Sequence, residues 1–156
     1  MKRAGFTMIE LIFVIVILGI LSAVALPKLI GVKEQASEGV IKGFVGTLNR
    51  TVAPAKWSAS LMDSDNGTIK KDAYKITDSD TDFPSDFSDT TIDTTKCADS
   101  TATSATATSA AAAAETTDNK YRIVCRDGNA STAPRFWYTE KSSGTVDFNT
   151  SKLKLD

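Results

Sequence analysis

The first sixty residues show two hydrophobic patterns in succession. Between Glu10 and Lys28 the chain carries no charge, and residues 11–21 are almost entirely apolar. A helix over residues 6–27 is roughly 33 Å long, which is enough to cross a hydrocarbon core of about 30 Å. The first pattern therefore predicts a helix of membrane-spanning length.

The second pattern, over residues 28–62, is that of an amphipathic helix. Its apolar residues recur mostly at four-residue steps, as expected for one face of a helix. This stripe comprises Ala36, Val40, Ile41, Phe44, Val45, Leu48 and Val52. The other face carries Lys33, Glu34, Glu38, Lys42, Asn49 and Arg50. We expect the apolar stripe to pack against a C-terminal head.

Helix-breaking residues mark three places along these patterns. Pro27 and Gly31 together predict a hinge or a locally unwound section, because proline removes a backbone hydrogen bond and glycine weakens a helix. Pro54 predicts a second kink. The turn-forming sequence of residues 63–67 predicts the end of the helix.

Residues 63–120 read as a connecting loop, acidic at first and then rich in Ser, Thr and Ala over residues 100–117. We expect Phe83 and Phe87 to anchor the acidic part, and the Ser/Thr/Ala part to form an exposed excursion. The spacing of Asp78, Asp80 and Asp82 is weakly similar to that of a calcium-binding loop. Phe83 stands where such loops need glycine, so we predict no metal site and no cofactor.

Residues 121–156 alternate between apolar and polar residues in short runs. Runs 121–126, 135–139 and 145–149, separated by turn residues, predict a three-stranded antiparallel sheet. Its helix-facing side would comprise Ile123, Cys125, Phe136, Tyr138, Val146 and Phe148. The predicted fold is therefore α+β, with a long N-terminal helix packed on a small antiparallel head.

Composition narrows the classes of function. The formal net charge is -1, which does not suggest an electrostatic nucleic-acid binder. Histidine is absent, which removes the commonest general base and the commonest transition-metal ligand. No carboxylates converge on ordered elements, and we predict no enzyme. The two cysteines, Cys97 and Cys125, lie outside the apolar segment and would form one disulfide in an exported chain.

The start of the chain is the most specific feature. A short basic stretch comes before Gly5 and Phe6. Glu10 then places a carboxylate in the apolar segment, and such a charge costs about 2.5–3.5 kcal/mol near the centre of a membrane helix. An ordinary secretory signal would explain Ala23-Val24-Ala25 as a cleavage site, and a plain membrane anchor would explain the length. Neither explains Glu10.

Together, Gly5, Phe6 and Glu10 resemble the N-terminal signal of type IV pilins and of the pseudopilins of type II secretion. The resemblance implies cleavage of leader residues 1–5 by a prepilin peptidase, methylation of the new Phe6 amine, and an assembly role for Glu10. Residues 6–27 would anchor the precursor in the bacterial inner membrane. Pilus assembly machinery would then polymerise the subunit with itself into an extracellular surface filament.

Two alternatives stay open beside a type IV pilin. A type II secretion pseudopilin shares the N-terminal signal, although the Asp-Pro-Trp-Gly-type segment of the major pseudopilins has no match here. A membrane-anchored binding module would keep its leader and would not polymerise.

Two further short motifs concern modification of the head. Asn129 and Asn149 each follow an acidic residue at two positions and precede Ser or Thr at two positions. This spacing is that of an extended bacterial N-glycosylation pattern.

Overall fold

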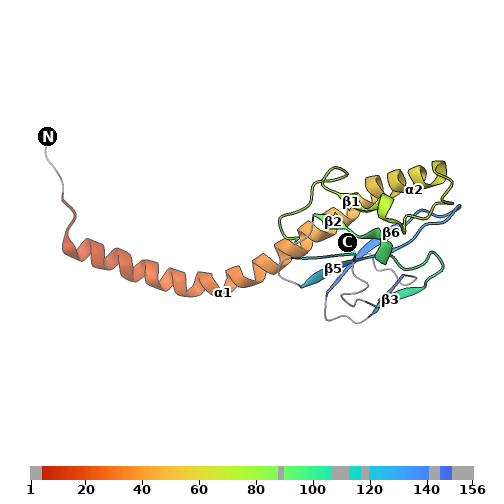
Figure 1. Cartoon of the computed structure of the whole chain (residues 1–156). Helices are drawn as coiled ribbons and strands as arrows, with labels where there is room; N and C mark the ends of the chain where they lie inside the picture. Colours follow the sequence, from red (N-terminus) through yellow and green to blue (C-terminus); the bar gives the residue numbers. More distant parts are fainter. Residues whose placement is uncertain (1–4, 88–89, 107–112, 117–119, 141–144, 149–156) are drawn as a thin grey trace. The chain divides into compact units, whose positions relative to one another are not determined.

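The computed structural model of the chain describes residues 5–87, 90–106, 113–116, 120–140 and 145–148. The chain divides into two compact units, an N-terminal unit, Met1–Glu38, and a head, Gly39–Asp156. Helices come first along the chain and short antiparallel strands follow (Figure 1). The α+β class predicted from the hydrophobic patterns is confirmed.

Three helical segments follow one another without a loop. Helix α1 comprises Met8–Thr47, the π-helix η1 comprises Leu48–Val52, and helix α2 comprises Ala53–Met62. Immediately afterwards Ser64, Asn66 and Gly67 have φ angles of 64°, 53° and 79°. These left-handed conformations end the helix within the predicted turn.

Gly67 is required at this turn for a second reason. A Cβ atom there would overlap the backbone carbonyl of Asn129 and lie 2.6 Å from Trp57 Nε1. The Trp57 indole donates to the same Asn129 carbonyl at 2.9 Å. The turn after α2 is thereby held against the loop that follows strand β5, Tyr121–Arg126.

The kink predicted at Pro54 takes the form of a π-helix. Pro54 lies in the first turn of α2, directly after η1. Its nitrogen cannot donate to the carbonyl of Arg50, and its ring crowds that carbonyl. A wider turn before the proline relieves this crowding, which accounts for the position of the π-helix.

The main core lies between the helix and the sheet. Ile41, Phe44, Val45, Leu48 and Val52 are buried in one cluster with strand residues of the head. Phe83 and Phe87 pack on Phe44, with ring centroids 5.1 and 5.2 Å from it. The predicted stripe and anchors are confirmed from Ile41 onward.

The N-terminal end of the predicted stripe does not join this core. Ala36 and Val40 are exposed. The first helix residue of the buried cluster is Ile41.

The central sheet has three antiparallel strands in the order β4, β5, β6. These strands comprise Ala114–Glu115, Tyr121–Arg126 and Arg135–Glu140. The last two are those predicted from the alternation of the sequence. The third strand of this sheet is β4, which comes from the Ser/Thr/Ala-rich segment and pairs with β5, and not residues 145–149 as predicted.

The remaining predicted strand pairs elsewhere. Strand β7, Thr145–Asp147, forms a separate two-stranded sheet with β3, Ser104–Thr106. Residues 100–117 therefore contribute two strands, and their reading as a purely exposed excursion is also wrong. Ala113, Ala114 and Thr116 are buried. A segment with small side chains can form a strand when neighbouring strands supply the apolar side chains that bury it. The alternation of residues within the segment itself does not reveal such a contribution.

Val146 and Phe148 lie on the opposite side of the central sheet from the one predicted. Val146 and Phe148 join a second cluster with Val124 and Trp137. Strand β5 is consequently buried on both faces. The β3–β7 sheet and its flanking residues supply the cover for this second face.

Short elements tie the acidic connection to the head. These are η2, Asp72–Tyr74; β1, Ile76–Thr77; β2, Thr91–Ile92; and η3, Thr94–Lys96. Strands β1 and β2 pair antiparallel, with Ile76 opposite Ile92. The connection is thus partly ordered by strand pairing rather than irregular throughout.

Asn49 joins the helix to the edge of the sheet. Its Oδ1 accepts from the Phe136 N–H at 2.9 Å, and its Nδ2 donates to the Phe136 carbonyl at 2.8 Å. The amide thus pairs with β6 as a neighbouring strand would. Its assignment to the solvent-facing side of the helix was wrong.

Candidate functional site

The candidate site is the beginning of α1, where Gly5, Phe6 and Glu10 lie within six residues. Helix α1 starts at Met8 because Thr7 accepts the first helical donors. The Thr7 carbonyl accepts from the N–H groups of Glu10 and Leu11 at 3.1 and 3.3 Å, and Thr7 Oγ1 lies 3.4 Å from the Glu10 nitrogen. Thr7 is therefore the N-cap of α1.

Gly5 and Phe6 precede this cap in non-helical backbone. Both residues are exposed. A Cβ atom built at Gly5 would meet no heavy atom of the structure within 4 Å. The packing of the described residues therefore gives no reason for glycine at this position.

Sequence reasoning missed the role of Thr7. The signal was present, because Thr7 and Glu10 have the Ser/Thr-x-x-Glu spacing of a helix N-terminal capping box. The same residues that make up the leader signal thus also determine where the helix begins.

Glu10 carries its carboxylate on the first turn of α1. The positive end of the helix dipole lies at this terminus. Among the described residues, no cation pairs with it. Lys28, the next basic residue after it in the sequence, lies about 27 Å further along an ideal helix. The carboxylate is exposed and lacks a charge partner within this part of the chain.

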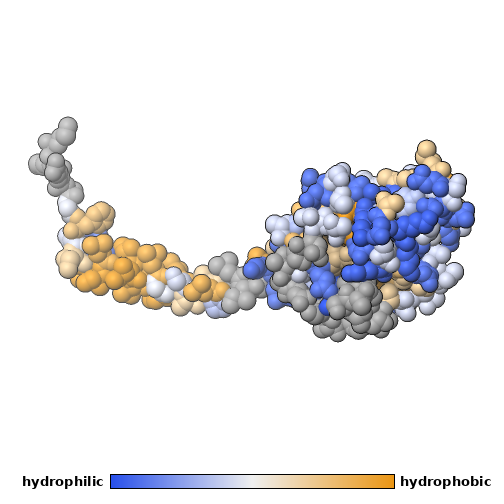
Figure 2. All heavy atoms as spheres, in the orientation of Figure 1, coloured by the Kyte–Doolittle hydropathy of each residue, from blue (hydrophilic) through white to orange (hydrophobic). Residues whose placement is uncertain are grey.

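The helix after Glu10 presents apolar side chains on every side. From Phe6 to Leu26, the large apolar side chains are between 40% and 79% exposed. Figure 2 shows this segment as a continuous hydrophobic surface. Among the described residues, the helical stretch Met8–Met62 has the length and composition needed to cross a membrane. An apolar surface of this extent requires lipid or other protein as its environment.

One polar group within the apolar segment is satisfied locally. The Ser22 hydroxyl donates to the Leu18 carbonyl at 2.7 Å. The hydroxyl therefore needs no partner outside its own helix, unlike the carboxylate of Glu10.

Pro27 and Gly31 lie inside α1, whose helical assignment continues through both. The locally unwound section is not seen in this structure. The hinge itself stays a prediction about the assembled molecule.

Cys97 and Cys125 form the predicted disulfide, with their Cα atoms 4.6 Å apart. Two backbone hydrogen bonds lie next to it in the sequence. The Ala98 N–H donates to the Cys125 carbonyl at 2.8 Å, and the Asp127 N–H donates to the Ala98 carbonyl at 2.7 Å. The bridge fastens the acidic connection to β5.

Of the two candidate glycosylation sites, Asn149 lies outside the described residues. Asn129 is half-buried, and its Oδ1 accepts from the Ser131 N–H and hydroxyl at 2.9 and 3.0 Å. Modification at either position remains a prediction.

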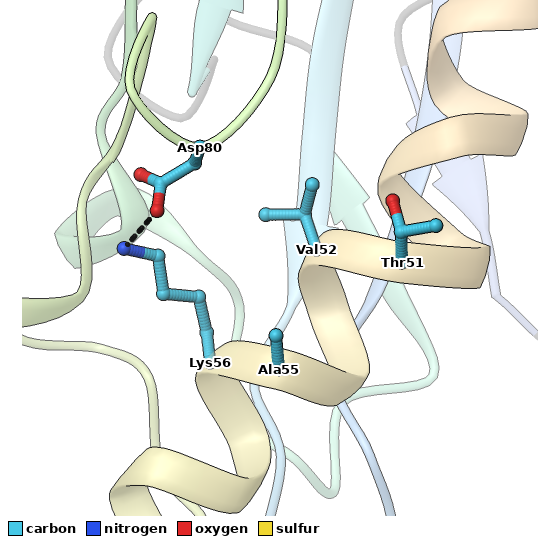
Figure 3. Close-up of a pocket in the computed structure, with 5 residues that line it drawn as sticks. All are labelled: Thr51, Val52, Ala55, Lys56 and Asp80. Atoms are coloured by element: carbon cyan, nitrogen blue, oxygen red, sulfur yellow. Dashed lines mark ion pairs between the residues drawn. The ribbon is translucent and has the colours of Figure 1, made fainter.

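The head also has an open pocket of about 460 Å³, which is lined by Thr51, Val52, Ala55, Lys56 and Asp80 (Figure 3). Lys56 Nζ and Asp80 Oδ1 form an ion pair at 2.8 Å. Burial raises the pKa of the Asp80 carboxyl, but hydrogen bonds from Lys56 and Thr77 outweigh it, and the pKa lies below its ordinary value. The two charged side chains that line the pocket are thus paired with each other.

Comparisons with known proteins agree with the geometry of the N-terminus. Residues 1–26 match the prokaryotic N-terminal methylation motif. The major component PilA5 of a type IV narrow pilus from Thermus thermophilus is 38% identical over 55 residues, which make up 35% of this chain and 47% of the relative. The chain thus spans about half the length of this relative. No solved structure matches the chain.

Proposed function

We propose that this chain is the structural subunit of a type IV pilus. The observation that carries the proposal is the motif Gly5-Phe6-Thr7-x-x-Glu10 at the start of an exposed apolar helix. The methylation motif over residues 1–26 and the similarity to a pilus component support it. A pilin is a structural protein, and the proposed activity is assembly rather than catalysis.

Processing would come first. A prepilin peptidase would cut after Gly5, and the new amine of Phe6 would then be methylated. Both residues lie before the helix begins and are exposed, so non-helical backbone is available to a protease. The cut leaves Thr7 as the helix cap, and α1 keeps its start.

Assembly would then exchange one apolar environment for another. The large apolar side chains of residues 6–26 are exposed in the single chain. In the inner membrane lipid would cover them, and in the filament the helices of neighbouring subunits would do so. Because the apolar area stays out of water in both states, the exchange costs little hydrophobic free energy.

Glu10 would provide the directional part of assembly. Its carboxylate has no cationic partner among the described residues. The Phe6 amine, with an ordinary pKa of about 7.7–8.0, is largely charged at neutral pH. An amine from one subunit would meet the carboxylate of a neighbour and set the axial position between them.

Electron microscopy of sheared surface filaments, with mass spectrometry of their main protein band, tests the proposal. We expect the band to contain this chain. Filaments confined to a secretion system would favour the pseudopilin alternative. A full-length chain that stays in the membrane and is absent from every filament would indicate a membrane-anchored binding module.

A further inference from the structure

Two arginines, Arg126 and Arg135, face each other across the pairing of β5 and β6. Residues directly opposite share one face of a sheet, with Cβ atoms about 4.5–5.5 Å apart, and like charges in this position are destabilising. Neither guanidinium forms an ion pair with any residue that the structure describes. The head therefore contains a concentrated positive charge that lacks compensation.

The position of this charge is fixed by packing. The guanidinium carbon of Arg126 lies 5.9 Å from the ring centroids of both Trp137 and Phe148, which are buried. These cation–π contacts hold the half-buried Arg126 in place. Arg135 is exposed beside it.

A complementary negative charge lies on the acidic connection. Asp78 and Asp82 are exposed, and among the described residues neither forms an ion pair. We call residues 78–82 the acidic loop. This loop is held at Asp80, which pairs with Lys56 at 2.8 Å (Figure 3) and accepts from the Thr77 N–H at 3.0 Å.

The two charged surfaces cannot neutralise each other within one subunit. Phe83, next to the acidic loop, packs on Phe44 in the core on the helix side of the sheet. The arginine pair instead shares the face of Val124 and Trp137, on the opposite side. Their charges can therefore meet only between two copies of the chain.

We propose that Arg126 and Arg135 of one subunit dock against the acidic loop of a neighbouring subunit in the filament. The inference rests on the proposed function. It adds a contact between the heads of neighbouring subunits to the packing of their helices. Because the contact joins two different surfaces, it is heterologous. Repeating a heterologous contact forms a ring or an open helical polymer, and the proposed filament is the open case.

A charge-swap experiment in cells that make only the full-length variant subunit tests this contact. The variants are Arg135→Glu, the double Asp78→Lys/Asp82→Lys, and all three changes together. Arg135→Lys is the matched control, since it keeps the charge. Arg126 is left unchanged because its side chain packs on the second core. The amount of subunit in sheared filaments is measured against the amount of oxidised mature subunit in the membrane.

We expect each reversal to lower the filament yield by at least about tenfold, because like charges would then face each other. The triple variant should recover most of the yield, and Arg135→Lys should match wild type. Normal yields from both reversals would overturn the contact. The proposed function would stand in that case, because the wild-type chain would still form filaments. Failure of the triple variant to recover would also overturn it and assign the arginines to another anion. Absence of the wild-type chain from filaments would overturn both proposals.

Discussion

Glu10 is the residue at which the energetic argument is strongest. An exposed carboxylate on a helix that otherwise presents apolar side chains is costly in lipid unless a cation reaches it. Removing one member of a buried ion pair can cost about 3–5 kcal/mol, because the other charge is left uncompensated. The carboxylate should therefore contribute to assembly and not to membrane insertion.

The variant Glu10→Ala separates these two steps. We expect it to insert in the membrane and to be cleaved after Gly5, but to produce few or no filaments. Glu34→Ala, which removes the same group from the polar part of α1, is the control and should be piliated normally. Immunoblots of membranes and sheared filaments give both readouts. Normal piliation by Glu10→Ala as the sole subunit would contradict the assigned role.

Asn49 offers a second prediction, on stability. Asn49→Ala removes both hydrogen bonds to Phe136 and leaves a strand N–H and carbonyl unpaired beside the core. We expect a loss of about 1–3 kcal/mol in the free energy of unfolding. Urea unfolding of the detergent-solubilised full chain, followed by tryptophan fluorescence, measures it. Arg50→Ala, at the adjacent exposed position, is the control, and equal stability of the two variants would refute the role of Asn49.

These two residues also show what a sequence can reveal. Glu10 was identifiable because a charge in an apolar segment is conspicuous in itself. Asn49 was misplaced because it is polar, although it is the next four-residue step after Ile41 and Val45 of the apolar stripe. Its side chain is turned toward the sheet and satisfied by the backbone of Phe136, a partner that the sequence of the helix cannot reveal.

At the scale of elements, the strands were predicted correctly where both the residue pattern and the pairing partner lie in adjacent sequence. Strands β5 and β6 alternate and are joined by a turn, so their pairing follows from adjacent sequence. Strands β3 and β4 come from a Ser/Thr/Ala-rich segment with little pattern of its own. They are strands because β7 and β5 offer them partners, and such long-range pairing cannot be seen in one segment.

The disulfide is the element-scale test. Closing a loop of about 29 residues stabilises the head by about 3.5 kcal/mol in the chain-entropy model. Cys97→Ala/Cys125→Ala should lower the melting temperature of the solubilised chain and increase proteolysis between residues 99 and 117. The flanking backbone hydrogen bonds at Ala98 should preserve the fold. Reduced wild type should melt like the variant, and two free thiols in oxidised filaments would exclude the bridge.

At the scale of the whole molecule, the two units have different requirements. The head contains its own buried clusters and its disulfide. The N-terminal unit exposes large apolar side chains along residues 6–26. Its environment must therefore come from outside the subunit; in the proposed function this is lipid before assembly and other subunits afterwards. A single segment can thus serve as membrane anchor and as filament core.

The chemical state of the first residue tests this account most directly. Intact-mass analysis and N-terminal sequencing of the subunit from sheared filaments should show a chain that begins at Phe6. Its mass should exceed that of residues 6–156 by one methyl group, in a disulfide-bonded form. A filament subunit that starts at Leu26, or a chain that retains Met1 and never enters filaments, would contradict the pilin assignment.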